Sequence, residues 1–221
     1  MTITFGQARA EVRLTIEDQA PAQAVVAKPR WWLILAGIVI VMAGAILAHT
    51  VRTSGGTAVT DVRFPGTNGT VMSALLYVPI NATPAAPAPG ILAVHGYINS
   101  RETQDGFAIE FARRGYVVLS IDQTGHGYSR GAAFSNGFGG PDGLSYLKSL
   151  PMVDARQIGL EGHSMGGWAV LAAAAAMPGA YSSMVLEGSS TGAPYAQEGS
   201  QSRPSNLAVV FSRFDEFSNL M

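Results

Sequence analysis

The sequence has 221 residues, with 14 Lys and Arg against 15 Asp and Glu, so its formal net charge is −1. Hydrophobic residues make up 48% of the chain and charged residues 13%, about half of the ~25% usual in soluble domains. A chain this apolar is not disordered, and its balanced charge argues against a nucleic-acid partner. Because Cys is absent, a disulfide scaffold, a Cys-ligated metal and a Cys nucleophile are excluded. No metal-ligand spacing occurs, so we expect neither a metal nor an organic cofactor.

Much of the apolarity lies in one uncharged stretch, Trp31–Ala48. As a helix it would be roughly 27 Å long, close to the ~30 Å hydrocarbon core of a bilayer. Trp31 and Trp32 open it, where aromatic residues lie at a membrane interface. Residues 1–30 therefore read as a polar N-terminal segment, and residues 31–48 as a transmembrane signal anchor that contacts the lipid bilayer. A cleaved signal peptide and a buried core helix are the alternative interpretations.

The basic residues around this stretch predict its orientation. Four lie in the first 30 residues, and two lie in the near C-terminal flank: Arg9, Arg13, Lys28 and Arg30, against Arg52 and Arg63. The positive-inside rule then places the N-terminus in the cytoplasm and the rest of a single-pass protein outside.

Beyond this anchor, strand and helix patterns alternate. Val59–Phe64 and Thr70–Val78 flank a Gly- and Asn-containing turn and predict an antiparallel hairpin. Short apolar runs, typical of strands buried on both faces, follow: Gly90–Val94, Tyr116–Ile121, Gln157–Glu161, Ser183–Glu187 and Leu207–Ser212. Helical patterns separate several of them: Thr103–Arg114, Pro141–Leu150 and Met165–Met177. The Pro- and Ala-rich stretch Ala82–Gly90 reads as a loop. This alternation predicts an α/β fold with a mostly parallel sheet, an antiparallel opening hairpin and helices on both faces.

One motif between a strand and a helix pattern has the spacing of a catalytic turn. Gly162-His163-Ser164-Met165-Gly166 matches G-x-S-x-G in a strand–turn–helix context. A sharp turn there lifts the Ser164 hydroxyl above the sheet edge, and the flanking glycines avoid collisions with neighbouring backbone. The start of the helix adds free N–H groups that suit a developing oxyanion. The alternative is that Ser164 is an ordinary turn or N-cap residue.

Two further segments follow strand patterns at their C-terminal ends, His95-Gly96-Tyr97 and Asp122–Ser129. With Gly162–Gly167, they make the sequence resemble the α/β-hydrolase family. Within it, the sequence is similar to the serine-aminopeptidase/monoacylglycerol-lipase-like or dienelactone-hydrolase-like branches. The resemblance covers about residues 57–217 and implies an α/β-hydrolase domain over residues 57–221.

The resemblance also implies roles for individual residues. Ser164 would be the nucleophile, and the backbone N–H groups of Tyr97 and Met165 would form the oxyanion hole. Each such donor stabilises the transition state by about 2.7–4 kcal/mol. His95 and Gly96 would shape the turn that aims the Tyr97 amide.

The acid of a catalytic triad has two candidates by the same resemblance. Asp215 follows the last strand pattern and matches the acid position, with a solvated loop carboxylate as its alternative reading. Glu187, at the end of the preceding strand pattern, is the second candidate. Asp122 belongs to a loop that orders the site edge and is expected to be structural.

The triad His has no counterpart, because no His follows His163 in the sequence. The other histidines belong to segments with other roles: His49, His95 and His126. Seven strand patterns occur, where the family core usually has eight with the His after the last. We therefore expect a C-terminally truncated product or fragment of a longer enzyme. The rival reading is a complete chain that cannot run triad chemistry.

These observations predict a membrane-anchored serine hydrolase that cleaves an ester or peptide/amide acyl bond of a small-molecule ester or peptide. The short segment Gly188–Ser205 predicts a minimal lid and an open cleft, suited to peptide ends or short soluble esters. One alternative is a non-catalytic hydrolase-fold binding protein that lacks the triad His. Another is a haloperoxidase- or acyltransferase-type member of the family that shares the same triad.

Overall fold

The computed structural model describes residues 30–189 and 206–210. Its first element is the helix α1, Trp31–Arg52, of 22 residues, which continues four residues past the predicted stretch. None of its side chains is buried. Among the helices of the described residues, α1 alone is long and apolar enough to cross a bilayer, by length and composition. The same properties are compatible with a single-pass anchor or with a signal sequence.

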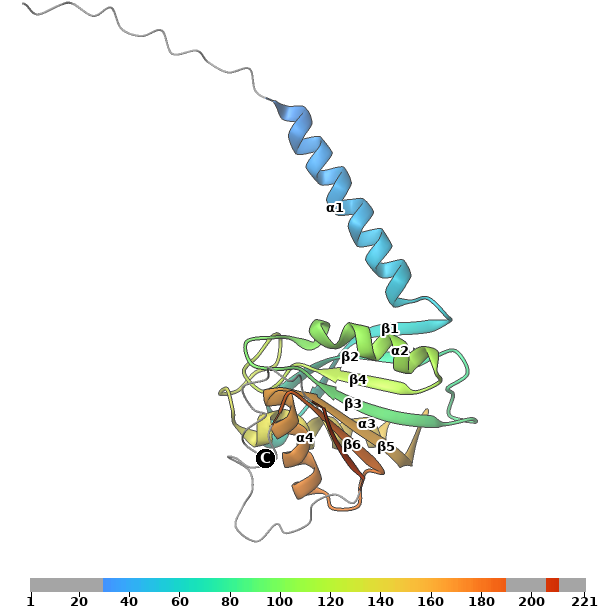
Figure 1. The fold of residues 1–221 in the computed structure, drawn as a ribbon, viewed down its shortest axis with the longest axis vertical. Coiled ribbons are helices and arrows are strands. Elements are labelled where there is room, and N and C mark those ends of the chain that lie inside the picture. Colours follow the sequence, from blue (N-terminus) through green and yellow to red (C-terminus); the bar gives the residue numbers. More distant parts are fainter. Residues whose placement is uncertain (1–29, 190–205, 211–221) are drawn as a thin grey trace, which may run out of the picture. The chain divides into compact units, whose positions relative to one another are not determined.

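The rest of the described chain is built on a seven-stranded mixed sheet (Figure 1). Its strands run in the order β1-β2-β4-β3-β5-β6-β7. Their bounds are Thr57–Pro65 (β1), Val71–Pro79 (β2), Ala88–Val94 (β3), Val117–Ile121 (β4), Val153–His163 (β5), Ser183–Glu187 (β6) and Leu207–Val210 (β7). The β1–β2 and β2–β4 pairs are antiparallel, and all the others are parallel. The predicted opening hairpin and mostly parallel sheet are therefore confirmed.

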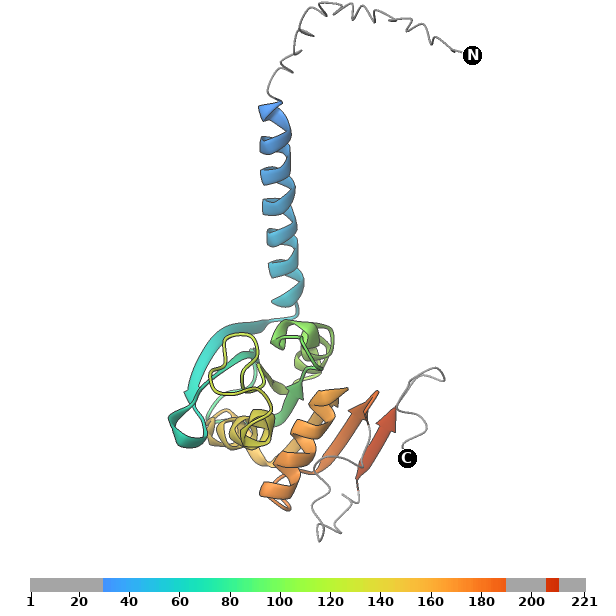
Figure 2. The ribbon, with the colours of Figure 1, turned by 90° about the vertical axis from the view of Figure 1, so that its left-hand side faces the viewer.

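Helices cover both faces of this sheet, as predicted. The helical segments are η1 (Thr67–Gly69), η2 (Arg101–Gln104), α2 (Asp105–Arg113), η3 (Asn136–Gly139), α3 (Gly140–Ser149) and α4 (Met165–Ala176). Helices α3 and α4 pack on one face in the larger core cluster, and α2 packs on the opposite face in the smaller one. Figure 2 shows α4 along the face of the sheet, with β6 and β7 side by side beyond it. Hydrophobic burial on both faces explains the short apolar strand patterns of the sequence.

Several strand boundaries differ from the sequence prediction, among them the starts of two parallel strands. Strand β5 begins at Val153 instead of Gln157, and β3 begins at Ala88, inside the stretch predicted to be a loop. The cause is a pairing between the two early segments, Ala88 with Val153 and Pro89 with Asp154, followed by a register shift. A proline at the start of a strand is compatible with such pairing.

The parallel strands place several loops at one edge of the sheet. Strands β3, β4, β5 and β6 end at Val94, Ile121, His163 and Glu187, and these ends are neighbours in the register. The residues that follow them therefore meet at the carboxyl edge, where open α/β sheets bind ligands.

Candidate active site

The turn between β5 and α4 holds Ser164 in an unusual backbone conformation. Its φ is 52° and its ψ is −120°, a region that residues with a Cβ rarely adopt. Its N–H donates to the Glu187 carbonyl oxygen at 2.8 Å, and its own carbonyl accepts from the Gly167 N–H at 2.9 Å. The Ser164 hydroxyl makes no capping bond to α4, so the N-cap interpretation lacks its defining contact.

Close backbone packing explains the two glycines of the G-x-S-x-G motif. A Cβ on Gly162 would lie 2.5 Å from the carbonyl carbon of Gly166 and 2.6 Å from the amide nitrogen of Gly167. A Cβ on Gly166 would collide with the Val94 carbonyl oxygen and lie 2.7 Å from that of His95. Both neighbours are backbone atoms that cannot swing aside. The turn therefore requires glycine at both places.

Backbone amides from two elements lie beside Ser164. Met165 is the first residue of α4, so its N–H has no carbonyl partner within the helix. On the other side, a Cβ built on Gly96 would lie 3.2 Å from the Ser164 Cβ and 3.1 Å from the His163 Nδ1. The backbone after β3 therefore passes directly beside the turn Gly162–Gly166, called the elbow below, and Tyr97 is the next residue along it.

His95 is fully buried, and both of its ring nitrogens are engaged. Its Nε2 accepts from the Gln123 N–H at 3.0 Å, which leaves the proton on Nδ1 to donate to the Gly96 carbonyl at 2.7 Å. Burial lowers the pKa of His95 below its ordinary value, which favours this neutral ring. The Gly96 carbonyl and the Tyr97 N–H share one trans peptide, so His95 sets the direction of that amide.

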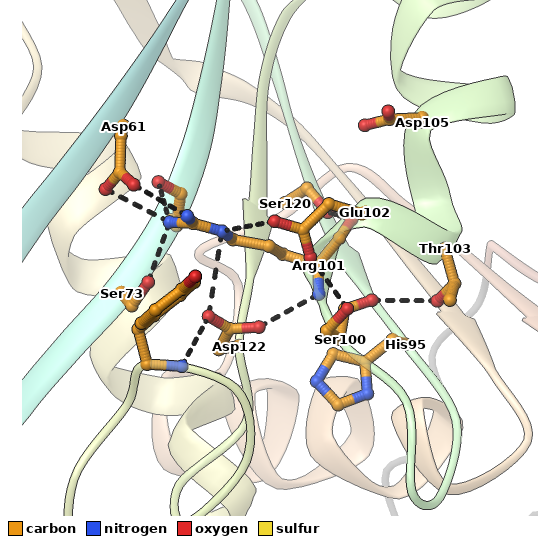
Figure 3. A network of polar contacts seen from close by, with 12 residues as sticks. Asp61, Ser73, His95, Ser100, Arg101, Glu102, Thr103, Asp105, Ser120 and Asp122 are labelled. Carbon is orange, nitrogen blue, oxygen red and sulfur yellow. Dashed lines mark hydrogen bonds and ion pairs between the residues drawn. The ribbon is translucent and has the colours of Figure 1, made fainter. Parts of the chain in front are cut away.

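An ionic network centred on the buried Arg101 and Asp122 supports the same edge of the sheet (Figure 3). Arg101 is only 3% exposed and donates to the Ser73 hydroxyl at 2.7 Å and to Asp61 at 2.6 Å. The backbone N–H of Arg101 donates to Asp122, which is fully buried and also accepts from the Tyr128 N–H. The bond from Arg101 holds the pKa of Asp61 below its usual value. Asp122 thus has the structural role expected of it.

Sequence reasoning did not single out Arg101. A lone Arg before a helix pattern looks like a solvated charge, and its two aspartate partners, Asp122 and Asp61, lie 21 and 40 positions away in the chain. Its neighbourhood gave one indirect signal, the glycine-rich loop after Asp122. A Cβ on Gly127 would collide with the Asp122 carboxylate, so that loop has to wrap tightly around a buried acid.

The acidic candidates are placed differently. Glu187 ends β6 and is the register partner of His163 on β5. Burial raises the pKa of the Glu187 carboxyl, and the His163 ring partly offsets that shift. Asp215 lies outside the described residues, so its role remains a prediction.

The remaining histidine of this edge, His126, is half-buried on the loop after β4. Its Nδ1 lies 3.2 Å from the Thr124 carbonyl oxygen, and its ring centroid lies 5.6 Å from that of His95. Within residues 30–189 and 206–210, no group of three His, Asp or Glu side chains converges as a metal site would require.

A family profile described as serine aminopeptidase, S33, matches residues 85–214, more than half of the chain. The chain belongs to this serine aminopeptidase S33 family. The suspected family is therefore confirmed, and the match runs across both the Gly96–Tyr97 segment and the Ser164 elbow of this S33 protein.

Solved structures resemble the S33 chain in fold. Acetyl xylan esterase 1 from Thermoanaerobacterium sp. is 19% identical, with a TM-score of 0.53. The match covers 61% of this chain and 49% of the esterase chain. A bacterial heroin esterase is 23% identical with a TM-score of 0.53, covering 68% and 50%. A putative dipeptidyl aminopeptidase IV from Bacteroides ovatus is 27% identical with a TM-score of 0.52, covering 60% and 21%.

These likenesses establish the α/β-hydrolase fold that the sequence predicted, and the family match makes the chain a hydrolase-type protein. The chain spans about half the length of the two esterases. In this S33 protein the elbow, the Met165 amide and the Gly96–Tyr97 backbone meet at the carboxyl edge, an arrangement suited to attack on a carbonyl beside preorganised N–H donors.

Proposed function

We propose that this protein is a serine hydrolase in which Ser164 attacks the acyl carbonyl of an ester or a peptide/amide. The observation that carries the proposal is the strained backbone of Ser164 at the start of α4, beside the Gly96–Tyr97 backbone. Strain of this kind is kept where a fold holds a reactive group in place. A serine that served only as a helix cap would show the capping bond that Ser164 lacks.

The reaction would run in two steps. The Ser164 Oγ forms a bond to the carbonyl carbon while its proton passes to a base, and the Met165 and Tyr97 amides stabilise the resulting oxyanion. The intermediate collapses, the alcohol or amine leaves with that proton, and water then releases the acyl group. His95 is not the base, because both of its ring nitrogens are already hydrogen-bonded. Asp215, or Glu187 as the second candidate, is proposed as the acid of the triad.

For the substrate, we propose a small ester or a peptide with a short acyl group. The names of two structural neighbours, an acetyl xylan esterase and a heroin esterase, support acyl esters, and the family description supports peptides. The short connection from β6 to β7 supports an open cleft and small substrates.

We further propose that residues 31–48 anchor the protein in a membrane, with the N-terminus in the cytoplasm and the hydrolase domain, residues 57–221, outside. The support is the length and apolarity of α1 together with the basic residues that precede it.

Active-site labelling tests the central assignment. The native protein, extracted from its own membranes in detergent, is treated with a small alkyl fluorophosphonate, and the modified residue is located by mass spectrometry. We expect the label on Ser164, none on Ser164→Ala, and normal labelling of Ser145→Ala, which changes an exposed serine on α3.

Turnover of p-nitrophenyl acetate, butyrate and palmitate is measured in parallel. We expect Ser164→Ala to lower kcat about 10⁴-fold or more. His126→Ala and His163→Ala show which of these rings, if either, serves as the base. If Ser164 stays unlabelled and no ester is hydrolysed, the non-catalytic binding protein becomes the better assignment.

A further inference from the structure

A row of aromatic rings borders the candidate active site. The Tyr97 and Phe134 rings are stacked, with centroids 5.9 Å apart and an interplanar angle of 29°. The His126 ring meets both of them edge-on, at 6.3 Å from Tyr97 and 6.2 Å from Phe134. Such offset and edge-to-face arrangements are those that aromatic rings prefer.

The row continues inward to the helix that follows Ser164. Phe134 meets Phe138 edge-on at 6.0 Å, and Phe138 lies 6.3 Å from Trp168. Trp168 stands four residues after Ser164 on α4, whereas Tyr97 follows the glycine that lies beside the Ser164 Cβ. The rings therefore join the two elements that would supply the oxyanion amides.

Exposure divides the row into an inner and an outer part. Phe138 is only 2% exposed and belongs to the core, whereas Tyr97 is 56% exposed and Phe134 is 48% exposed. Two large rings stacked in solvent at the edge of a hydrolase-type site form an apolar surface of the kind that marks binding sites.

The loop that carries Phe134 is held in a strained but ordered shape. Phe134, Asn136 and Phe138 on this loop, and Ile98 on the separate loop after β3, all have positive φ, between 53° and 67°. With Ser164, they are five of the six such non-glycine residues in the described part of the chain. Strain concentrated in this way is a feature of ligand-binding sites.

Backbone contacts fix the ends of that loop. The Thr124 N–H donates to the Phe138 carbonyl at 3.1 Å, and the Arg130 N–H donates to the Val71 carbonyl at 2.8 Å. A Cβ on Gly137 would lie 2.9 Å from the Ala172 Cβ, so the loop also packs tightly on α4. The rings are therefore in place before a ligand arrives, which lowers the entropic cost of binding.

We propose that Tyr97, Phe134 and His126 form a subsite for an aromatic ring carried next to the carbonyl that Ser164 attacks. This inference rests on the proposed function and adds a substrate class to it, namely aryl esters or amides. A planar ring can stack on the exposed faces of Tyr97 and Phe134. A saturated ring of the same size gains only the burial of apolar surface.

Binding to Ser164→Ala protein tests this inference without turnover. Dissociation constants are measured by ligand-observed NMR for two matched pairs, phenyl against cyclohexyl acetate and methyl benzoate against methyl cyclohexanecarboxylate. The two pairs place the ring on either side of the ester. In at least one pair, we expect the aryl member to bind about 2- to 10-fold more tightly, the range of a single aromatic contact.

Three variants in the same background locate the preference. Phe134→Leu should remove the aryl preference, and Phe134→Tyr should keep it because the ring remains. Phe107→Leu should also keep it, because Phe107 is a comparably exposed ring on α2 that stacks on Phe111. The inference is overturned if aryl and cyclohexyl members bind equally, or if the preference survives in Phe134→Leu. Loss of phosphonate labelling with the aryl preference intact would count against the proposed function alone.

Discussion

Ser164 keeps a positive φ although it carries a Cβ, and its neighbours show why the chain accepts that conformation. The N–H and carbonyl of Ser164 both make hydrogen bonds, one across to β6 and one within the turn. Gly162 and Gly166 let the backbone segments approach more closely than any side chain would permit. The cost of the strained residue, of order 1–3 kcal/mol, is thus offset by well-paired surroundings.

The residue scale gives a direct test of the elbow. We expect Gly166→Ala to lower the free energy of unfolding by more than about 2 kcal/mol and to abolish phosphonate labelling, because the new Cβ collides with the Val94 carbonyl oxygen. Gly159→Ala, on the strand β5 that leads into the turn, is the control, since its Cβ would meet its nearest neighbour at an ordinary 3.4 Å. Urea unfolding in detergent measures the free energy of unfolding of both variants. Equal stability of the two variants would show that the elbow is not packed as described.

At the scale of elements, β5 carries a carboxyl group that the proposed chemistry does not use. Glu161 is 2% exposed, and neither of its carboxylate oxygens has a hydrogen-bond partner among the described residues. Burial raises the pKa of Glu161 well above its ordinary value, and Glu187 on the neighbouring strand β6 adds to the shift. Burial and the neighbouring Glu187 therefore favour the protonated form of Glu161.

The sign of this shift predicts a pH dependence of stability. A carboxyl with a raised pKa in the folded state stabilises the fold fully below its unfolded pKa of about 4.5, and that contribution is lost as the pH rises through the folded value. We expect the stability advantage of Glu161→Gln over the wild type to grow as the pH increases above about 4.5.

Urea unfolding at several pH values between 4 and 9 checks this expectation. Glu110→Gln is the control, because bonds from Arg114 and Arg113 lower the pKa of the exposed Glu110. The contribution of Glu110 to stability is present above its unfolded pKa and is lost as the pH falls. This trend is opposite to the one expected for Glu161. A pH-independent difference between Glu161→Gln and the wild type would falsify the assignment.

At the scale of the whole molecule, α1 and the hydrolase unit have different physical requirements. Helix α1 has no buried side chain, which agrees with the lipid contact proposed for it, whereas the sheet buries its own apolar strands beneath α2, α3 and α4. The proposed topology follows from this division and from the basic residues before α1.

Because the sequence contains no Cys, single introduced cysteines can report that topology. We expect a membrane-impermeant maleimide to label Ser145→Cys in intact cells and to label Gln19→Cys only after the membrane is permeabilised. Carbonate extraction should leave both proteins in the membrane fraction. Labelling of Gln19→Cys alone in intact cells would reverse the proposed orientation, and release by carbonate would contradict the anchor.

The sequence alone determined what depends on nearby residues. Apolar runs predicted the strands, and the spacing of G-x-S-x-G located the strained turn. These features are local because sterics and hydrogen bonding act over a few residues. Even there, β3 and β5 began earlier than expected, because pairing with a distant strand added their first residues.

The tertiary structure decided everything that depends on contacts between distant segments. The place of β3 between β4 and β5, the burial of Arg101 against Asp61, and the stacking of Tyr97 on Phe134 join residues far apart in the chain. No local pattern encodes these contacts, because they follow from how the sheet packs and from which polar groups remain to be paired once it has formed.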